Sequence, residues 1–481
     1  MGETAERKLT PANENPWYVL MTLYGEQEGE EIDWELHAKN RQAWNAWAGK
    51  DVPHTKLKEI AQKLKVGARE LSGGQQLAKT TENLFSDAWK RIGGGVTPVS
   101  MPRSYSPIDL RGVLFHHKLV LDGFFIPSSL SVVDARFCSE LRAYRTCFQH
   151  DFFLTSADIQ DRFFVESAEI FGGFYAAHAS FNEFSLFRST IRGPTFMPEA
   201  RSFRHARFSE TKFQQTADFS KAELLSDVSF SECFFGGLAH FRATKFQARA
   251  SFWGATFVNR SYFSEALFGH TRDEGTCLSD FTDCQFDQPS TFRDAKFRDA
   301  YPILEGAMLH PTTVFTAEEA HWPKGTNQEA KQVRDSCASL RHVLTQQGLP
   351  EDAHFFFRRE MAAAGQIGNL WQRLPYHLFR IFSEYGHSIA RPTWWLIGCW
   401  ALGVAAFWGY FASTGQGGLG KAMGVSFSNL FPLFGFGRLY LQDVLRGLPT
   451  VLKAWSGLQT VFSLPMLFFL GLGLRQRFRL R

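Results

Sequence analysis

The feature that most constrains the fold of this chain is a short period of phenylalanine between residues 239 and 268. Successive Phe residues are five or six positions apart in alternation, and a small residue stands two positions before each of them. Neither the 3.6-residue period of a helix nor the two-residue period of a half-buried strand produces this spacing. One bulky and one small inward side chain per short segment is what the narrow core of a solenoid requires. The bulky residues are Phe241, Phe246, Phe252, Phe257, Phe263 and Phe268, and the small ones are Ala239, Thr244, Ala250, Ala255, Ser261 and Ala266.

This pattern resembles that of the pentapeptide-repeat proteins, in a Phe-centred form with mixed five- and six-residue steps. The resemblance implies a right-handed quadrilateral β-helix, with four short faces per coil and with the bulky and small residues pointing inward. Four segments with the observed steps give about 22 residues per coil. Successive coils should then lie about 4.8 Å apart, so that the rings stack in ladders.

The repeats are expected over residues 108–316, beginning near Ile108 and becoming clear from Phe137. A small residue precedes several of the inward positions, but Asp151 and Arg162 do not fit this slot. The inward positions predicted by five- and six-residue steps are Phe148, Phe153, Ile159, Phe164, Ile170, Tyr175 and Phe181.

Two interruptions are visible in the repeats. Pro194 and Pro198 mark a break in phase, and the residues HTRDEGT, 270–276, predict a loop that bulges from the solenoid. The last clear pair of repeats is Phe292 and Phe297, with weaker coils reaching Phe315. After the break the inward series is predicted to resume at Phe203, Phe208, Phe213 and Phe219.

Charge and cysteine content narrow the possible partners. Residues 137–315 carry 18 Lys and Arg and 22 Asp and Glu, a net charge of 18 − 22 = −4, with the two signs interspersed. This pattern predicts neither DNA mimicry nor a nucleic-acid partner. The cysteines form no Cys-x-x-Cys pair, and several occupy small inward slots, so we expect buried, reduced thiols rather than metal ligands or disulfides. They are Cys138, Cys147, Cys233, Cys277, Cys284, Cys337 and Cys399.

Residues 1–100 are predicted to form a small, mostly helical N-terminal module that ends in a Gly- and Pro-rich linker. Residues 15–27 predict a short strand or buried turn. Helices are predicted at 31–49, 56–65 and 80–92. The module is interpreted as a capping or protein-binding unit. The first ten residues have no apolar stretch after their charges, so no signal peptide is predicted.

Residues 326–391 change to a helical pattern, predicting a helical hairpin that covers the open end of the solenoid and a juxtamembrane helix. Residues 392–481 contain two uncharged apolar runs, 394–412 and 454–474, each long enough to span a bilayer. A buried hairpin of a soluble protein is the alternative. The basic residues flanking both runs predict that both termini are cytoplasmic. They are Arg373, Arg380, Arg391, Arg475, Arg477, Arg479 and Arg481.

The last 370 or so residues also resemble a broader set of bacterial membrane-anchored pentapeptide-repeat proteins, in which a helical hairpin, two spans and an Arg-rich tail follow the repeats. This resemblance implies the bacterial inner membrane and no established activity. Between the spans, residues 422–437 are uncharged but too short to cross, which predicts an interfacial or re-entrant segment. Gly435-Phe436-Gly437 stands where two-helix pore-loop channels carry Gly-Tyr-Gly, although Pro432 and Arg438 depart from that pattern.

Several motifs match active-site signatures by letters alone. Residues 71–75 spell the LSGGQ signature of ABC transporters, but the sequence has no phosphate-binding loop to act with it. Residues 415–420 match a dinucleotide-binding fingerprint but follow an apolar helix instead of a strand. His342, His354 and Glu360 have no metal-ligand spacing. We therefore predict no enzyme activity, and no catalytic, cofactor-binding or metal-binding residues.

The predicted function is that of a non-enzymatic, membrane-anchored scaffold whose β-helix presents a cytoplasmic protein-binding surface. Its predicted partners are the lipid bilayer and another protein. The alternative is an oligomeric two-transmembrane pore-loop ion channel with a β-helical cytoplasmic domain, which would require a homo-oligomer.

Overall fold

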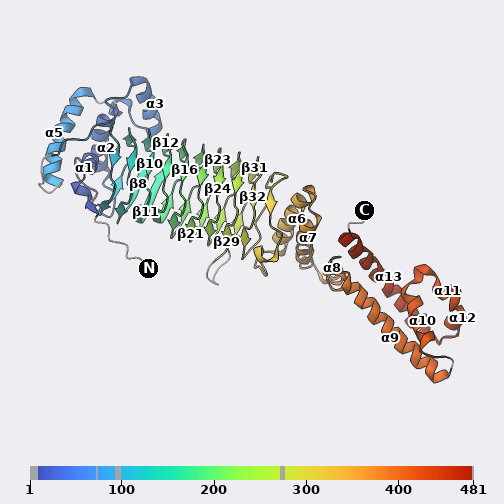
Figure 1. Cartoon of the computed structure of the whole chain (residues 1–481). Helices are drawn as coiled ribbons and strands as arrows, with labels where there is room; N and C mark the ends of the chain where they lie inside the picture. The colour runs from blue at the N-terminus through green and yellow to red at the C-terminus, as the bar shows by residue number, and fades with distance from the viewer. Residues whose placement is uncertain (1–8, 72–73, 93–98, 271–276, 416, 479–481) are drawn as a thin grey trace. The chain divides into compact units, whose positions relative to one another are not determined.

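The computed structural model describes residues 9–71, 74–92, 99–270, 277–415 and 417–478 (Figure 1). The chain divides into two compact units, one ending at Phe355 and the other beginning at Phe356. Each unit is described by itself below. The first contains a β-solenoid with helices at its N-terminal end, and the second contains only helices among its described residues.

The solenoid consists of very short parallel strands that wind through about nine turns. Its strands form three sheets, which we call sheets I, II and III. Sheet I contains β2 (Ile108–Asp109), β6 (Leu130–Ser131), β10 (Phe152–Phe153), β13 (Phe174–Tyr175), β16 (Thr195–Phe196), β20 (Ala217–Asp218), β24 (Ala239–His240), β28 (Ser261–Tyr262), β32 (Thr291–Phe292) and β34 (Val314–Phe315). Sheet II contains β5 (Phe125–Ile126), β9 (Cys147–Phe148), β12 (Glu169–Ile170), β15 (Thr190–Ile191), β19 (Lys212–Phe213), β23 (Phe234–Phe235), β27 (Thr256–Phe257) and β31 (Gln285–Phe286).

Sheet III is branched, because two longer strands, β11 and β14, belong to both of its rows. One row contains β1 (Thr10–Pro11), β3 (Val113–Phe115), β7 (Arg136–Phe137), β11 (Asp158–Glu166), β14 (Ser180–Ser185), β17 (Arg201–Ser202), β21 (Glu223–Leu224), β25 (Lys245–Phe246), β29 (Leu267–Phe268) and β33 (Lys296–Phe297). The other row adds β4 (Leu119–Val120), β8 (Leu141–Tyr144), β18 (Ala206–Arg207), β22 (Val228–Ser229), β26 (Ala250–Ser251) and β30 (Ser279–Asp280).

The strand register confirms the period that the Phe spacing predicts. Phe213 pairs with Phe235, and Phe235 pairs with Phe257, so each partner lies one predicted period further along the chain. Phe257 pairs with Phe286, and this separation is longer by (286 − 257) − (257 − 235) = 7. This insertion equals in length the predicted loop at 270–276, most of which lies outside the described residues.

Stacked aromatic rings fill the interior, as the six Phe residues of the 239–268 stretch predict. All six are buried, together with the six small residues that precede them. The rings of Phe235, Phe257 and Phe286 lie parallel, with centroids 4.7 and 4.8 Å apart. This distance equals the spacing of hydrogen-bonded strands, so each Phe stacks on its equivalent in the next turn. At the C-terminal end Trp322 stacks on Phe297 at 5.0 Å and covers the last ring of its ladder.

A turn with left-handed backbone geometry recurs at regular intervals along the solenoid. In most of them, the amide of the next residue donates to a carbonyl three positions earlier, as Ala255 does to Phe252 at 2.9 Å. Such turns favour glycine, yet most of these positions carry charged or polar side chains. Their φ values lie between 51° and 69° in the first part of the solenoid, at Gly112, Gly123, Asp134, Arg145, Ser156, Ser167, His178 and Arg188.

The predicted inward register is wrong for part of the solenoid. Phe152, Phe163 and Phe174 are the buried residues, whereas the predicted Phe153, Phe164 and Tyr175 face outward. The reason is that two inward positions of one strand segment share a fixed volume. Here the first of them is bulky, as in Phe174 with Ala176, whereas in later turns the second is bulky, as in Ala239 with Phe241.

The predicted phase break at Pro194 lies earlier in the structure, within β14, where one residue is missing from a turn. Ile159 pairs with Phe181 at the full period, but Arg162 pairs with Glu183, one position short of it. After the break Phe208, Phe213 and Phe219 are buried as predicted, but Phe203 is 52% exposed. The inward place in its strand belongs to Ser202, which pairs with Phe181.

The N-terminal helices pack against the first turns of the solenoid. They are η1 (Ala12–Glu14), α1 (Pro16–Met21), α2 (Trp34–Gly49), α3 (His54–Leu64), α4 (Ala68–Leu71) and α5 (Gly74–Ile92). The helices predicted at 31–49, 56–65 and 80–92 are confirmed as α2, α3 and α5. The prediction of a strand or turn at 15–27 is wrong at α1, because Pro16 opens the helix and Asn15 caps it by accepting from the amides of Trp17 and Tyr18. The predicted linker at 93–98 lies outside the described residues.

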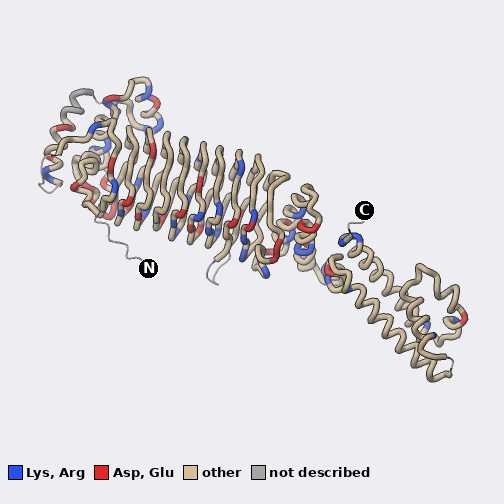
Figure 2. The backbone as a smooth tube through the Cα atoms, in the orientation of Figure 1, with Lys and Arg blue, Asp and Glu red and all other residues tan. Residues whose placement is uncertain are grey.

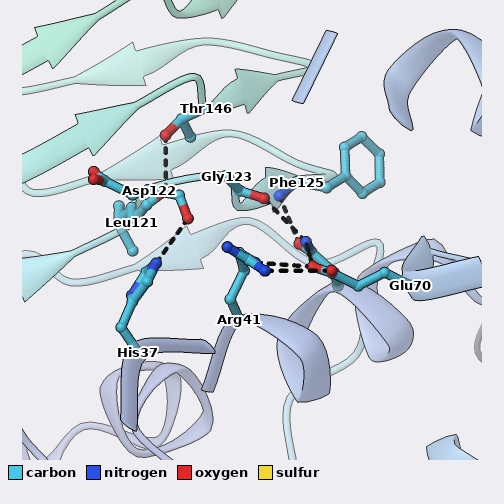
Figure 3. Close-up of polar contacts among 9 residues, drawn as sticks. His37, Arg41, Glu70, Leu121, Asp122, Gly123, Phe125 and Thr146 are labelled. Carbon is cyan, nitrogen blue, oxygen red and sulfur yellow. Dashed lines mark hydrogen bonds and ion pairs between the residues drawn. The ribbon is translucent and has the colours of Figure 1, made fainter. Parts of the chain in front are cut away.

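Helix α2 is attached to the solenoid through polar contacts (Figure 3). Trp44 Nε1 donates to the carbonyl of Phe125 at 2.7 Å. Asn45 donates to the carbonyl of Gly123 and accepts from the amide of Phe125. His37 Nε2 lies 2.9 Å from the carbonyl of Asp122, and Arg41 pairs with Glu70 of α4. The open edge of sheet II at β5 is therefore hydrogen-bonded by side chains, whereas on sheet III a further strand, β1, pairs with β3.

The helices after the solenoid match the predicted sequence of elements. They are η2 (Glu319–His321), α6 (Ala330–Gln346) and α7 (Pro350–Ala364), which contains the boundary between the units. Gln347, at the end of α6, donates to the carbonyls of Pro311 and Thr313 in the last turn. The second unit continues with α8 (Leu370–Ser383), α9 (Ala390–Thr414), α10 (Leu419–Leu430), η3 (Pro432–Phe434), α11 (Phe436–Tyr440), α12 (Gln442–Gly447) and α13 (Thr450–Phe478).

Helices α9 and α13 are long and apolar enough to span a membrane. In each, only 22% of the most apolar 18-residue window is buried, so most of the apolar side chains face the surroundings of the protein. The short helix α10 packs against both, and its Ala422 and Val425 lie in a cluster with Phe407 and Phe411 of α9. Most of α10 lies in the segment 422–437, for which an interfacial or re-entrant position is predicted from the sequence.

The packing of Phe252 generates a direct test of the solenoid core. Its ring is fully buried and stacks between Phe230 at 5.1 Å and Phe281 at 4.9 Å. Phe252→Ala should lower the free energy of opening of the surrounding strands by about 3–5 kcal/mol. Amide hydrogen exchange in the detergent-solubilised full-length chain measures this quantity.

Trp253 provides the matched control, because it is the next residue and is 43% exposed. Trp253→Ala should change the exchange of the same strands by at most about 0.5 kcal/mol. Equal effects of the two substitutions would contradict the inward register.

His37 predicts a pH dependence for the attachment of the N-terminal helices. Burial lowers the pKa of His37 below its ordinary value of 6.5. Below about pH 6.5, His37 takes up a proton when α2 is detached but not when α2 is packed. The packing of α2 is therefore fully stable above about pH 6.5 and becomes less stable as the pH decreases. Amide exchange in α2, corrected for the intrinsic rate, should therefore increase between about pH 7.5 and about pH 5.5. His37→Gln should reduce this dependence, and an unchanged pH profile in that variant would contradict it.

Candidate functional site

Three outward aromatic side chains lie on neighbouring strands of sheet I, and we call them the aromatic row: Phe153, Tyr175 and Phe196. The register places Phe153 beside Tyr175, and Tyr175 beside Phe196. The rings of Phe153 and Tyr175 stack with centroids 5.0 Å apart, and Phe196 is 42% exposed. Strands β10, β13 and β16 thus place three aromatic side chains side by side on one outer face, with Phe153 and Tyr175 partly exposed and Phe196 exposed.

Local sequence holds the row in place. Strand alternation turns Phe153 and Tyr175 outward because their neighbours Phe152 and Phe174 fill the interior. A Cβ atom on Gly173 would lie 2.6 Å from the Tyr175 ring, so glycine is required for the ring to lie there. Burial, and then the nearby Asp151 carboxylate, raises the pKa of Tyr175. The phenol is therefore a neutral hydrogen-bond donor at neutral pH.

The flanks of the row are apolar or small beside Tyr175 and Phe196, whereas Asp151 lies near Tyr175 and Asp218 pairs with Phe196 in the next strand. Pro194 and Pro198 flank Phe196, and Ala177 follows Tyr175 by two residues. Sheet III instead carries ion pairs from turn to turn, such as Glu223 with Arg201 and with Lys245. Figure 2 shows such blue and red positions alternating along the lower edge of the solenoid. An exposed aromatic strip of this kind is typical of a protein-binding surface.

The row was missed in the sequence because Phe153 and Tyr175 were assigned to the interior. The available signals were the misfits Asp151 and Arg162 and the adjacent aromatic pairs at 152–153, 163–164 and 174–175. In a strand, adjacent residues face opposite sides, so a pair of neighbouring aromatics places one of them outside.

Small inward slots account for two of the seven cysteines, Cys233 and Cys284. Cys233 Sγ donates to the carbonyl of Phe208, and Cys284 Sγ to that of Phe252, as Thr244 Oγ1 does to Phe219. Burial raises the pKa of the Cys233 thiol, so it stays protonated and unreactive. The prediction of burial is wrong for Cys138, which is exposed, and Cys399 is partly buried. All seven thiols are free.

The other motifs do not come together as active sites. Residues 71–75 lie at the end of α4 and the start of α5, with 72–73 outside the described residues. The glycines at 415–420 connect α9 to α10, and the described part of this unit contains no strand. His342 contacts Gln346 of its own helix. The described residues contain no group of three or more His, Cys, Asp and Glu that could hold a metal ion.

A buried polar cluster joins α9, α10 and α13, and no pattern in the sequence predicted it. Asn429 of α10 donates to Gln459 Oε1 at 3.0 Å and accepts from Ser456 Oγ at 2.9 Å. Gln459 also donates to Ser426 Oγ and to the carbonyl of Cys399. A Cβ atom at position 403 would lie 1.9 Å from Gln459 Nε2, so Gly403 makes room for this amide.

No family model, curated protein or solved structure matches this chain. The functional argument therefore depends on the geometry of its own residues.

Proposed function

We propose that this protein is a non-enzymatic, membrane-anchored scaffold that binds another protein through the aromatic row of its solenoid. The observation that carries this proposal is the stacked, outward position of Phe153 and Tyr175 next to the exposed Phe196. Rigid aromatic side chains contribute large contact area with little loss of conformational entropy, which is why they dominate protein interfaces. The strand ladders hold the row in position before any partner binds.

The finer classification is part of the same proposal. The five- and six-residue steps support a right-handed, four-faced solenoid of the pentapeptide-repeat type. We propose that α9 and α13 span the inner membrane of a bacterium, with both termini cytoplasmic. Support comes from two basic residues, Arg391 near the start of α9 and Arg475 near the end of α13. These two helix ends lie side by side, because a Cβ atom on Gly473 would lie 3.1 Å from Ile389.

A matched pair of substitutions tests the proposed binding surface. Phe196 lies in the aromatic row, and Phe234, 38% exposed on sheet II, lies outside it. Phe196→Ser should lower the recovery of a co-purifying protein from detergent-solubilised membranes by about tenfold or more, as loss of an interface hot spot does. Phe234→Ser should leave the recovery unchanged. If the two variants retain the same partners, the aromatic row is not the binding surface.

The alternative function is a pore-loop channel, and the packing of α10 is the observation that favours it. This short helix lies against both α9 and α13, and the chain then turns at Gly435, whose φ is +69°. A re-entrant helix followed by a glycine turn is the arrangement of pore loops. However, Arg446 and Lys453 line the same space as Gly435 and Gly437. Fixed positive charges beside a cation filter are electrostatically unfavourable.

We therefore expect no selective single-channel current from the purified protein in planar bilayers. Replacing Gly435 and Gly437 together by Ala should alter neither membrane insertion nor recovery of the soluble partner. Reproducible cation-selective openings that disappear in this double variant would overturn the anchor function and support the channel.

A further inference from the structure

A polar pocket opens between α10 and the segment that leads into α13. Its volume is about 680 Å³, and it lies within the second unit. Three of its polar residues follow one face of α13 at spacings of three and four, which places them in line along the helix. The polar and charged residues that carry the argument are Ser428, Asn429, Arg446, Lys453, Ser456 and Thr460.

The charges at this pocket are positive. Arg446 of α12 and Lys453 of α13 both line it, and both are exposed. Neither forms an ion pair within the part of the chain that the structure describes, although Asp443 lies one helical turn before Arg446. Two cations that lack acidic partners at a concave surface favour an anionic ligand.

The floor of the pocket is held by hydrogen bonds. Asn429 is buried and bonded to both Ser456 and Gln459, and Ser463 Oγ contacts its carbonyl. Thr460 donates to the backbone of its own helix. The hydroxyl protons of Ser456 and Thr460 are therefore engaged, and the two oxygens can only accept a further hydrogen bond, so the contacts to an anion fall to the two cations.

The rim of the pocket is apolar and exposed. Leu433 itself lines the pocket and is 79% exposed, and Phe434, Leu439 and Tyr440 are similarly exposed. In water such a group of side chains would be unfavourable, whereas at a membrane surface it would contact acyl chains while the cations contact headgroups. This combination distinguishes a lipid from a free anion.

We propose that this pocket binds the phosphate of an anionic phospholipid, with Arg446 and Lys453 contacting the phosphate oxygens and the rim contacting the acyl chains. This inference depends on the proposal that α9 and α13 span a bilayer and on nothing proposed for the solenoid. Free phosphate shares the same anionic chemistry, but it would make no use of the apolar rim.

The test uses the full-length chain in detergent and native mass spectrometry. Three probes are titrated: phosphatidylglycerol, a diacylglycerol with the same acyl chains, and inorganic phosphate. We expect phosphatidylglycerol to bind at least about tenfold more tightly than either of the others, since a hydrogen bond to a charged group contributes that much or more. Lys453→Gln should weaken this binding about tenfold, and Lys453→Arg should retain it.

Lys421→Gln is the matched control, because it removes the same charge from the segment between the two spans without altering the pocket. If Lys453→Gln and Lys421→Gln lose equal phosphatidylglycerol affinity, the attraction is diffuse electrostatics and the proposed site is wrong. Equal binding of phosphatidylglycerol and diacylglycerol would overturn the phosphate contact, and equal binding of inorganic phosphate would replace the lipid by a free anion. Resistance of the protein to carbonate extraction tests membrane insertion separately, so the two proposals can fail independently.

Discussion

The structure of the solenoid depends on how much volume each strand segment can place inside a narrow tube. Two inward positions two residues apart share this volume, so that one is large when the other is small. Ala239 with Phe241 and Phe174 with Ala176 are two solutions of the same constraint. Because rings of successive turns then lie 4.7–5.1 Å apart, stacking follows from the hydrogen-bonded spacing of the strands.

The turns show what the stacked core can tolerate. Residues such as Glu199, Glu210 and Lys221 adopt left-handed backbone geometry, which costs a non-glycine residue about 1–2 kcal/mol. Each is nevertheless placed by the buried residues on either side, and its charge reaches across to the next turn, as in the pair of Lys221 with Glu199. The interval between these turns is the sum of one five- and one six-residue step, and the left-handed residue lies in the five-residue step, as Ala243 does between Phe241 and Phe246.

Much of the fold was predictable because the period of the repeats has only one structural solution. The limits Ile108 and Phe315, the period of the turns and the two long apolar helices all follow from spacing and composition. The inward register near Phe153 was not predictable from Phe spacing alone, since Phe152 and Phe153 are adjacent and only one of them faces inward. Ser202 escaped prediction because Phe203 stands five residues before Phe208 and so fits the Phe spacing. The aromatic row was hidden because the same residue types occupy both sides of the strand.

The interior of the second unit differs from that of the solenoid, because several polar side chains are buried within an apolar helix bundle. Asn429 and Gln459 are tolerated because each is hydrogen-bonded across helices and because Gly403 leaves space beside them. These bonds fix α10 against α13 at the level of Ser456. In a pore-loop channel the residues after α10 would form the filter. Several copies of the chain would then surround one axis, and α10 would have to keep this position in each copy. The same bonds hold Asn429 and Ser456, which line the pocket beside Lys453.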